Sequence, residues 1–229
     1  MAVARIVERP VTSRRAEICR TAARIFRDRG FDATSVSDIA RALRMTKAGL
    51  YHYFDSKEAL LFEIMTFGLE RVHDEVVIPA TRIRDPEARL RQIVITHARI
   101  TTRAQGAVTQ LFDETPALSP AARKSIRERQ RHYSRLIRDT LEELRKAGRL
   151  RDVDITVAAF SIIGMILWLP RWFRQSGRLT SEQAALEIAN MALAGVLRPG
   201  PNGRGRKATR LRRMPPRTPQ QAAEKRSLK

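Results

Sequence analysis

The stretch TSVSDIARALRMTKAGLYHYFDSKEALL, residues 34–61, decides the fold. Ser35 is a suitable N-cap for one helix, with Asp38 three residues later as in a capping box, and Thr46 is a suitable N-cap for the next. Only a tight turn at Arg44 separates the two segments. Two short helices joined in this way are typical of a helix-turn-helix, whose second helix enters the major groove of DNA.

The second of these helices carries residues suited to contacting DNA. Leu50 and Phe54 have the spacing of a buried face. Lys47 and Tyr51 are therefore left outside, where a lysine can reach guanine or a phosphate and a tyrosine hydroxyl can donate to a phosphate. Gly49 has no side chain, so the helix can approach the base pairs or the DNA backbone closely. The predicted DNA-contacting residues are Ser35, Ser37, Arg44, Thr46, Lys47, Ala48, Gly49, Tyr51, His52, Tyr53 and Lys57.

The flanking segments also have helical periodicity. Ile18, Ala22 and Phe26 form an apolar stripe before this stretch, and Gly30 is placed to end that helix in the left-handed conformation. Another helix is predicted over residues 56–77. Strand signals are nearly absent, so the predicted class is all-α, with an N-terminal three-helix helix-turn-helix domain and a helical C-terminal domain for ligand binding and dimerisation.

Residues 13–60 resemble the DNA-binding domain of TetR-family transcriptional regulators. The matching stretches are AARIFRDRGFDATSVSDIARAL and MTKAGLYHYFDSKEALL, which follow the family spacing without a gap. Many members have glycine where Arg44 stands and histidine where Tyr53 stands, and neither departure changes the assignment. The resemblance implies a DNA-binding domain at 12–72 and a homodimer formed through the last two helices. Its recognition helices would lie about 34–36 Å apart on a near-palindromic double-stranded DNA operator.

The charge distribution favours a polyanionic partner. The chain has 44 Lys and Arg against 24 Asp and Glu, a net charge of +20. Half of this excess lies in residues 198–229, which are rich in proline and glycine and poor in apolar side chains. Residues 199–229 are therefore predicted to be a basic disordered tail, which adds salt-sensitive DNA affinity or serves only solubility.

No catalytic or metal-binding pattern accompanies these features. The four histidines are scattered without the spacing of a metal site, and Cys19 lies on a buried stripe. We therefore expect no enzyme activity, no cofactor and no metal. A single cysteine and the lack of an apolar leader favour the cytoplasm. The apolar run at 157–170 is too short for a transmembrane helix and suits a buried core helix, so no membrane partner is expected.

The second half, residues 85–198, is predicted to bind an effector and to dimerise. Helices are expected at about 86–103, 106–114, 119–147, 153–176 and 180–197. Small residues at i, i+4 and i+7 of the last helix would let another helix pack closely. The predicted dimer interface is Ala185, Ala189 and Ala192.

Arginines and aromatic residues in this half indicate a pocket that is apolar inside and basic at its mouth, which suits an amphipathic anion. The stretches RERQRHYSRLIRDTLEELRKAGRLR and WLPRWFRQSGRLTSEQA are similar to the ligand-binding part of TetR-type repressors of fatty-acid and sterol degradation, which sense acyl-CoA thioesters. The predicted effector-binding residues are Arg99, Arg103, Arg131, Arg135, Trp168, Arg171, Trp172 and Phe173. Two plainer interpretations stay open: the arginines form a solvated helix face, and the tryptophans are ordinary core aromatics.

The sequence thus predicts a ligand-responsive repressor whose small-molecule effector is an acyl-CoA or a similar amphipathic anion. An apolar drug-like or aromatic effector is one alternative. An architectural protein that binds DNA without regard to sequence is another, because charge alone would support it. The operator, the effector, and whether the effector releases DNA or promotes binding are left open by the residues.

Overall fold

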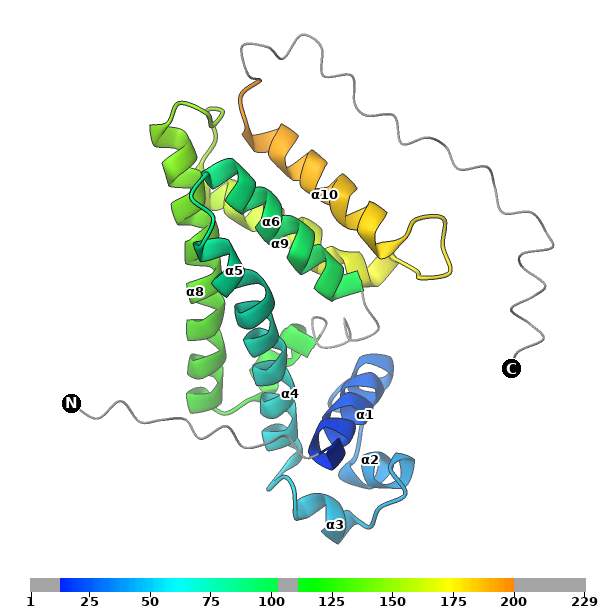
Figure 1. Cartoon of the computed structure of the whole chain (residues 1–229). Helices are drawn as coiled ribbons and strands as arrows, with labels where there is room; N and C mark the ends of the chain where they lie inside the picture. Colours follow the sequence, from blue (N-terminus) through cyan, green and yellow to red (C-terminus); the bar gives the residue numbers. More distant parts are fainter. Residues whose placement is uncertain (1–12, 103–110, 200–229) are drawn as a thin grey trace, which may run out of the picture. The chain divides into compact units, whose positions relative to one another are not determined.

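The structure, a computed structural model, describes residues 13–102 and 111–199. Over these residues the chain is helical, with one isolated antiparallel bridge between Leu150 and Leu197 and no strand (Figure 1). The predicted all-α class is therefore confirmed. The described residues up to Arg198 form one compact unit.

The described helices run as follows: α1 (Ser13–Arg29), α2 (Val36–Ala42), α3 (Lys47–Tyr51), α4 (Lys57–Val72), η1 (His73–Val77), α5 (Ile78–Thr81), α6 (Pro86–Thr102), η3 (Leu111–Ala117), α8 (Pro120–Lys146), α9 (Ile155–Trp172) and α10 (Ser181–Val196). η1 is a π-helical turn and η3 a 3-10 helix. The helix predicted over 56–77 therefore continues to residue 81 through η1 and α5. The helix predicted at 106–114 lies mostly outside the described residues, and its last part begins η3.

Local capping interactions set the ends of the first helices. The Ser35 side chain accepts from the backbone N–H of Asp38, while the Asp38 carboxylate accepts from the N–H of Ser35, which completes a capping box. Thr46 caps α3 by accepting from the N–H of Gly49 at 3.0 Å. Gly30 follows α1 with φ +84°. All three predicted boundaries are confirmed.

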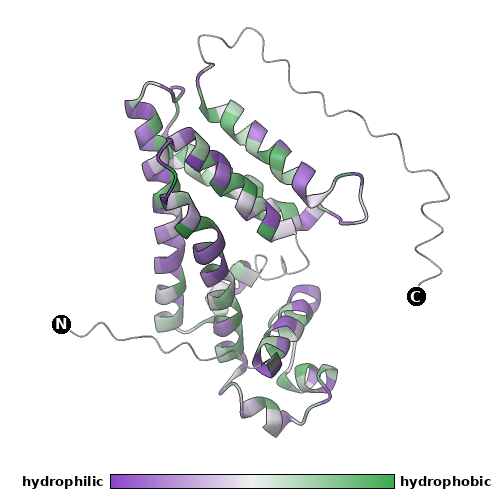
Figure 2. Ribbon diagram, in the orientation of Figure 1, coloured by the Kyte–Doolittle hydropathy of each residue, from purple (hydrophilic) through white to green (hydrophobic). Residues whose placement is uncertain are grey.

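Two apolar cores hold the compact unit together. The head, which we define as α1–α4, has a core of side chains from these helices, and Leu118 and Ile126 complete it from η3–α8. The second core lies among α6, α8, α9 and α10 and extends to η1. Along α8, hydrophobic and hydrophilic residues alternate with the helical repeat, so one face packs inward and the other is hydrophilic (Figure 2).

α9 is long and apolar enough to cross a membrane, judged by length and composition alone. Ile162, Ile166 and Leu169, on one of its faces, are fully buried in the second core. The predicted end at about residue 176 comes early, at Trp172, two residues after Pro170. One face of α9 is therefore that of a core helix.

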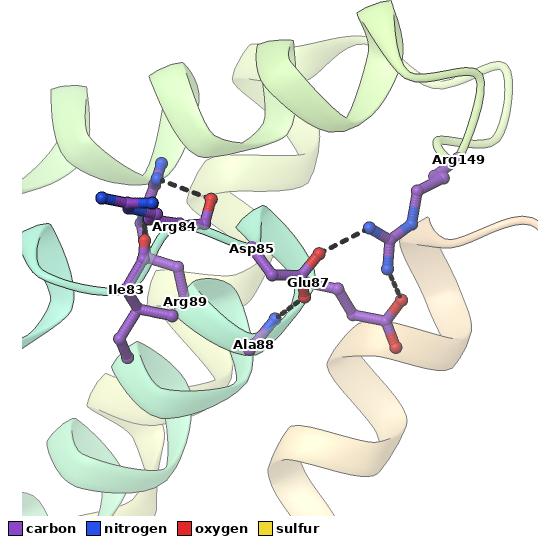
Figure 3. A network of polar contacts seen from close by, with 7 residues as sticks. All are labelled: Ile83, Arg84, Asp85, Glu87, Ala88, Arg89 and Arg149. Atoms are coloured by element: carbon purple, nitrogen blue, oxygen red, sulfur yellow. Dashed lines mark hydrogen bonds and ion pairs between the residues drawn. The ribbon is translucent and has the colours of Figure 1, made fainter.

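An ion-pair network fixes the start of α6 against the turn that follows α8 (Figure 3). Asp85 accepts from the N–H of Ala88 at 2.8 Å and from the guanidinium of Arg149 at 2.7 Å, and Arg149 also pairs with Glu87. The Arg149 guanidinium lowers the pKa of Asp85 below its ordinary value. Residues far apart in sequence are thereby held together at the edge of the second core.

Candidate DNA-binding and effector sites

The exposed face of α3 carries polar side chains. Leu50 and Phe54 are buried, as predicted from their spacing. Lys47 and Tyr51 are exposed on the same helix, and the Lys47 ammonium lies 5.9 Å from the centre of the Tyr51 ring. Ser37, Arg44, Ala48 and His52, from the same region of the chain, are also exposed. Their contact with DNA stays a prediction.

The turn before α3 carries backbone strain. Arg44 has φ +52°, the left-handed region that glycine tolerates better. The conformation lets the N–H of Met45 bond to the carbonyl of Ala40 at 2.9 Å, which closes the turn between α2 and α3. Arg44 thus places a basic side chain on the exposed surface in a backbone conformation that is unfavourable for residues other than glycine.

Gly49 has an internal reason to be glycine. A Cβ there would lie 3.2 Å from Oγ1 of Thr46, the hydroxyl that caps α3. The space for a side chain at residue 49 is therefore limited by the capping hydroxyl of its own helix, independently of any DNA contact. The sequence interpretation named only the close approach to DNA.

Several predicted DNA contacts also hold the head together. The Lys57 ammonium donates to the carbonyls of Phe31 and Thr34 at 2.9 and 3.0 Å and lies 4.2 Å from the Phe31 ring centre. Tyr53 is half-buried, and its carbonyl accepts from Arg15 at 2.9 Å. Lys57 therefore keeps one of its three N–H donors for a phosphate.

α4 and η1, together with η3, α6, α8 and α9, border an open cavity of about 710 Å³. Its apolar lining comes from α4, α6 and α9, with Phe67, Ile100 and Ile163 as examples. This volume falls in the range of small-molecule sites.

The charged side chains that line the cavity are all basic. They are Arg71, Arg127, Arg129 and Arg131, and no carboxylate accompanies them; His73 and His132 also belong to the polar lining. Arg71 pairs with Glu75 at 2.5 Å, and Arg129 with Glu70 at 3.3 Å. Among the described residues no acid pairs with Arg127 or Arg131. An anion at this lining would meet uncompensated positive charge.

Most residues predicted to bind the effector lie elsewhere. Arg131 lines the cavity, whereas Arg135 does not. Arg99 makes a two-pronged ion pair with Glu182 at 2.5 and 2.6 Å. Arg103 lies outside the described residues. The cluster Trp168, Arg171, Trp172 and Phe173 is also absent from the lining.

That cluster has contacts of its own. The Arg171 guanidinium lies 4.7 Å from the Trp168 ring centre and donates to Asp113 at 2.7 Å. Trp168 is 58 % exposed and Trp172 47 %, while Phe173 is buried. The two tryptophans are therefore surface side chains, and neither the cavity nor the core accounts for them.

The alanine stripe of α10 is used within its own chain. Ala185, Ala189 and Ala192 are almost fully buried in the second core, where α10 packs along α6. This burial leaves the three residues almost no exposed surface for a partner subunit, and their place in a dimer interface stays a prediction. Small residues do permit close helix packing here, but the neighbouring helix belongs to the same chain.

An exposed apolar strip lies instead on α9. Val157, Phe160 and Trp168 are each more than half exposed, and Gly164 between them opens to empty space. Their spacing of three and four places them on one helical face. Met191 adds an exposed side chain, 62 % accessible, on α10. We call Val157, Phe160, Gly164 and Trp168 the α9 strip.

Neither the requirements of a metal site nor those of a reactive thiol are met by the described residues. No group of three or more potential metal ligands occurs there. Burial raises the pKa of the Cys19 thiol to about 12, so the thiolate is scarce at neutral pH.

Comparison with known proteins identifies the class as helix-turn-helix transcriptional regulators. The family model described as bacterial regulatory proteins, tetR family, matches residues 18–64, and the tetracyclin repressor-like C-terminal domain matches residues 84–196. The repressor KstR2 of Rhodococcus jostii (strain RHA1) is 30 % identical over 191 residues, which cover 82 % of this chain and 93 % of that protein. The chain therefore belongs to the TetR family of transcriptional regulators, whose members bind DNA and are not enzymes.

Two solved structures extend the comparison. AibR in complex with isovaleryl coenzyme A and operator DNA is 38 % identical, with a TM-score of 0.71 over 77 % of this chain and 96 % of that one. The ketosteroid transcriptional regulator KstR2 of Mycobacterium tuberculosis is 28 % identical, with a TM-score of 0.75 over 82 % and 97 %. The chain is thus similar over nearly the whole length of both.

Proposed function

We propose that this regulator is a cytoplasmic repressor that binds a near-palindromic operator as a homodimer and responds to an acyl-CoA thioester. The observation that carries the proposal is the cavity, which joins an apolar lining to four arginines and no carboxylate. An acyl group would occupy the apolar part and the CoA phosphates the cationic part. The similarity to AibR, solved with isovaleryl coenzyme A, supports this effector class.

The exposed face of α3 is the proposed DNA reader. Lys47 can bond to guanine or phosphate, and Tyr51 and His52 can reach the backbone. Arg44 adds positive charge at the turn before the helix. A buried Leu50 and Phe54 behind this face hold α3 against the head core, so its orientation is fixed before DNA arrives.

The α9 strip is the proposed contact with the second subunit. Apolar side chains as exposed as Val157 and Trp168 are stabilised when a partner covers them, and Gly164 would let a helix of that partner approach closely. Pairing along α9 would use the face opposite the core residues of the same helix.

Elements shared by the head and the cavity can couple the two sites. α4 places Leu61 and Met65 in the head core and Phe67 in the cavity lining. Phe112 of η3 lines the cavity and packs against the head core. α8 begins where the N–H of Ser119 donates to Glu58 of the head at 2.7 Å. An effector that favours a different spacing of these elements would lower the affinity for DNA. The size of the effect is set by how much more tightly the effector binds the conformation with that spacing than the DNA-binding conformation.

DNA binding tests the reader. Fluorescence anisotropy would compare the DNA upstream of the gene with a shuffled fragment at ~0.15 M salt. Lys47→Ala should weaken binding to the upstream DNA about tenfold or more. Lys146→Ala, an equal charge change in the last turn of α8, should have little effect. Equal affinity for both fragments would favour an architectural DNA-binding protein instead.

A further inference from the structure

A buried polar pair lines the cavity. His97 of α6 and Tyr133 of α8 meet with Nδ1 of the histidine 2.7 Å from the tyrosine hydroxyl, and their rings lie edge to face. The side chains are only 5 % and 8 % exposed, yet both line the cavity. The pair is therefore accessible from the cavity and almost nowhere else.

Both members of the pair are neutral at physiological pH. Burial lowers the pKa of His97 to about 4 and raises the pKa of Tyr133 well above its ordinary value. The two groups then share two polar hydrogens, one on the imidazole and one on the hydroxyl.

Hydrogen counting leaves one donor unused. If the hydroxyl donates to Nδ1, the hydrogen on Nε2 of His97 is left over; if Nδ1 donates to the hydroxyl, the tyrosine hydrogen is left over. Among the described residues no group hydrogen-bonds to Nε2, and Tyr133 has no second partner. Nε2 is not one of the fully buried unpaired atoms among these residues, so it keeps accessible surface, and an oxygen arriving from the cavity can accept from the donor that is left over.

The position of the pair separates it from the cationic lining. Arg127, Arg129 and Arg131 lie exposed on α8, whereas His97 and Tyr133 lie buried. A phosphate or carboxylate would be attracted to the arginines. A neutral pair whose tyrosine belongs to the second apolar core suits a neutral acceptor.

We propose that His97 and Tyr133 form the specificity determinant of the cavity and hydrogen-bond a neutral carbonyl or hydroxyl oxygen of the effector's acyl part. The inference rests on the proposed acyl-CoA function. Two sources supply such an oxygen: the thioester carbonyl itself, or an oxygen substituent on the acyl chain. In either case an effector that lacks the oxygen leaves the donor of the pair unpaired and binds more weakly.

Calorimetric titration of the full chain separates the two sources. Isovaleryl-CoA against S-isopentyl-CoA, the thioether without the carbonyl, tests the thioester. Acetoacetyl-CoA against butyryl-CoA tests an added chain carbonyl. The oxygen-bearing member of one comparison should bind about three- to tenfold more tightly, and His97→Phe and Tyr133→Phe should each abolish that preference.

Thr140→Val is the matched control. It removes another buried hydroxyl of α8, one that donates to the carbonyl of Leu136 at 2.8 Å and does not line the cavity. This variant should keep the wild-type preference. If His97→Phe and Tyr133→Phe instead weaken both members of each comparison equally, the pair only holds α6 to α8 and the proposal is overturned.

A ligand pair without CoA distinguishes failure of this inference from failure of the proposed function. Cyclohexanone and methylenecyclohexane differ by the carbonyl oxygen and can be compared through the ¹⁵N resonances of the His97 ring. If no thioester binds but the ketone shifts these resonances and the hydrocarbon does not, the acyl-CoA function fails while the pair keeps its role. Equal responses to the two, or none, overturn the inference.

Discussion

Replacing His97, whose imidazole lines the cavity, should make the free energy of unfolding less sensitive to acid. Burial holds the pKa of His97 at about 4, against an ordinary value of 6.5. Below pH 6.5 the unfolded chain therefore binds a proton that the folded chain does not, so the free energy of unfolding falls with pH until about 4. The full loss is about 3 kcal/mol, of which about 2 kcal/mol is reached by roughly pH 5.

His97→Gln tests this prediction because glutamine keeps hydrogen-bonding capacity without titrating. Urea unfolding of wild type and variant at about pH 7.5 and about pH 5 gives the four free energies required. The wild type should lose about 2 kcal/mol more than the variant between the two conditions. Thr140→Val, a buried loss on α8 without a titrating group, should follow the wild-type pH dependence. If the free energies of unfolding of wild type and His97→Gln fall by the same amount between the two pH values, His97 is not a neutral buried imidazole.

Three further changes probe the head and its attachment. Thr46→Ala should cost about 1 kcal/mol in urea unfolding because α3 loses its cap, whereas Thr46→Ser should cost little; equal losses would contradict the capping role. Leu118→Ala should lower the free energy of unfolding by about 2–5 kcal/mol and Leu118→Met by less than about 1.5 kcal/mol, since the side chain is buried in the head core; a near-neutral alanine variant would mean that the turn between η3 and α8 does not complete that core. Arg149→Gln should cost under about 1 kcal/mol, because its pairs are partly exposed. The ionised Asp85 carboxylate stabilises the fold above the pKa that it has in the unfolded chain, and this stability is lost as the pH falls through its lowered pKa in the folded chain. The free energies of unfolding of wild type and Arg149→Gln should therefore become equal in acid. A difference that persists there would refute the ion-pair origin.

The head was predictable because its signals are local. Ser35, Thr46 and Gly30 act on neighbouring residues through hydrogen bonds or backbone conformation, so their roles follow from the sequence alone. The buried positions of Leu50 and Phe54 follow from helical spacing. A family pattern without gaps reinforced the same boundaries.

The cavity was less predictable because its lining depends on tertiary packing. His97 and Tyr133 stand 36 residues apart on different helices, and no sequence period connects them. Arg131 of α8 was among the predicted effector-binding residues, but nothing in the sequence indicates which arginines border open space. Ala185 and Ala189 illustrate the same limit, because small residues suit close packing equally well within a chain and between chains.

Reciprocal coupling between DNA and effector tests the central claim most directly. The affinity for upstream DNA is measured with and without saturating isovaleryl-CoA, and the affinity for isovaleryl-CoA with and without saturating DNA. A ligand-responsive repressor of this class requires both affinities to change by the same factor, typically about 5- to 150-fold. Selective DNA binding that is unchanged by a thioester known to be bound would contradict the account.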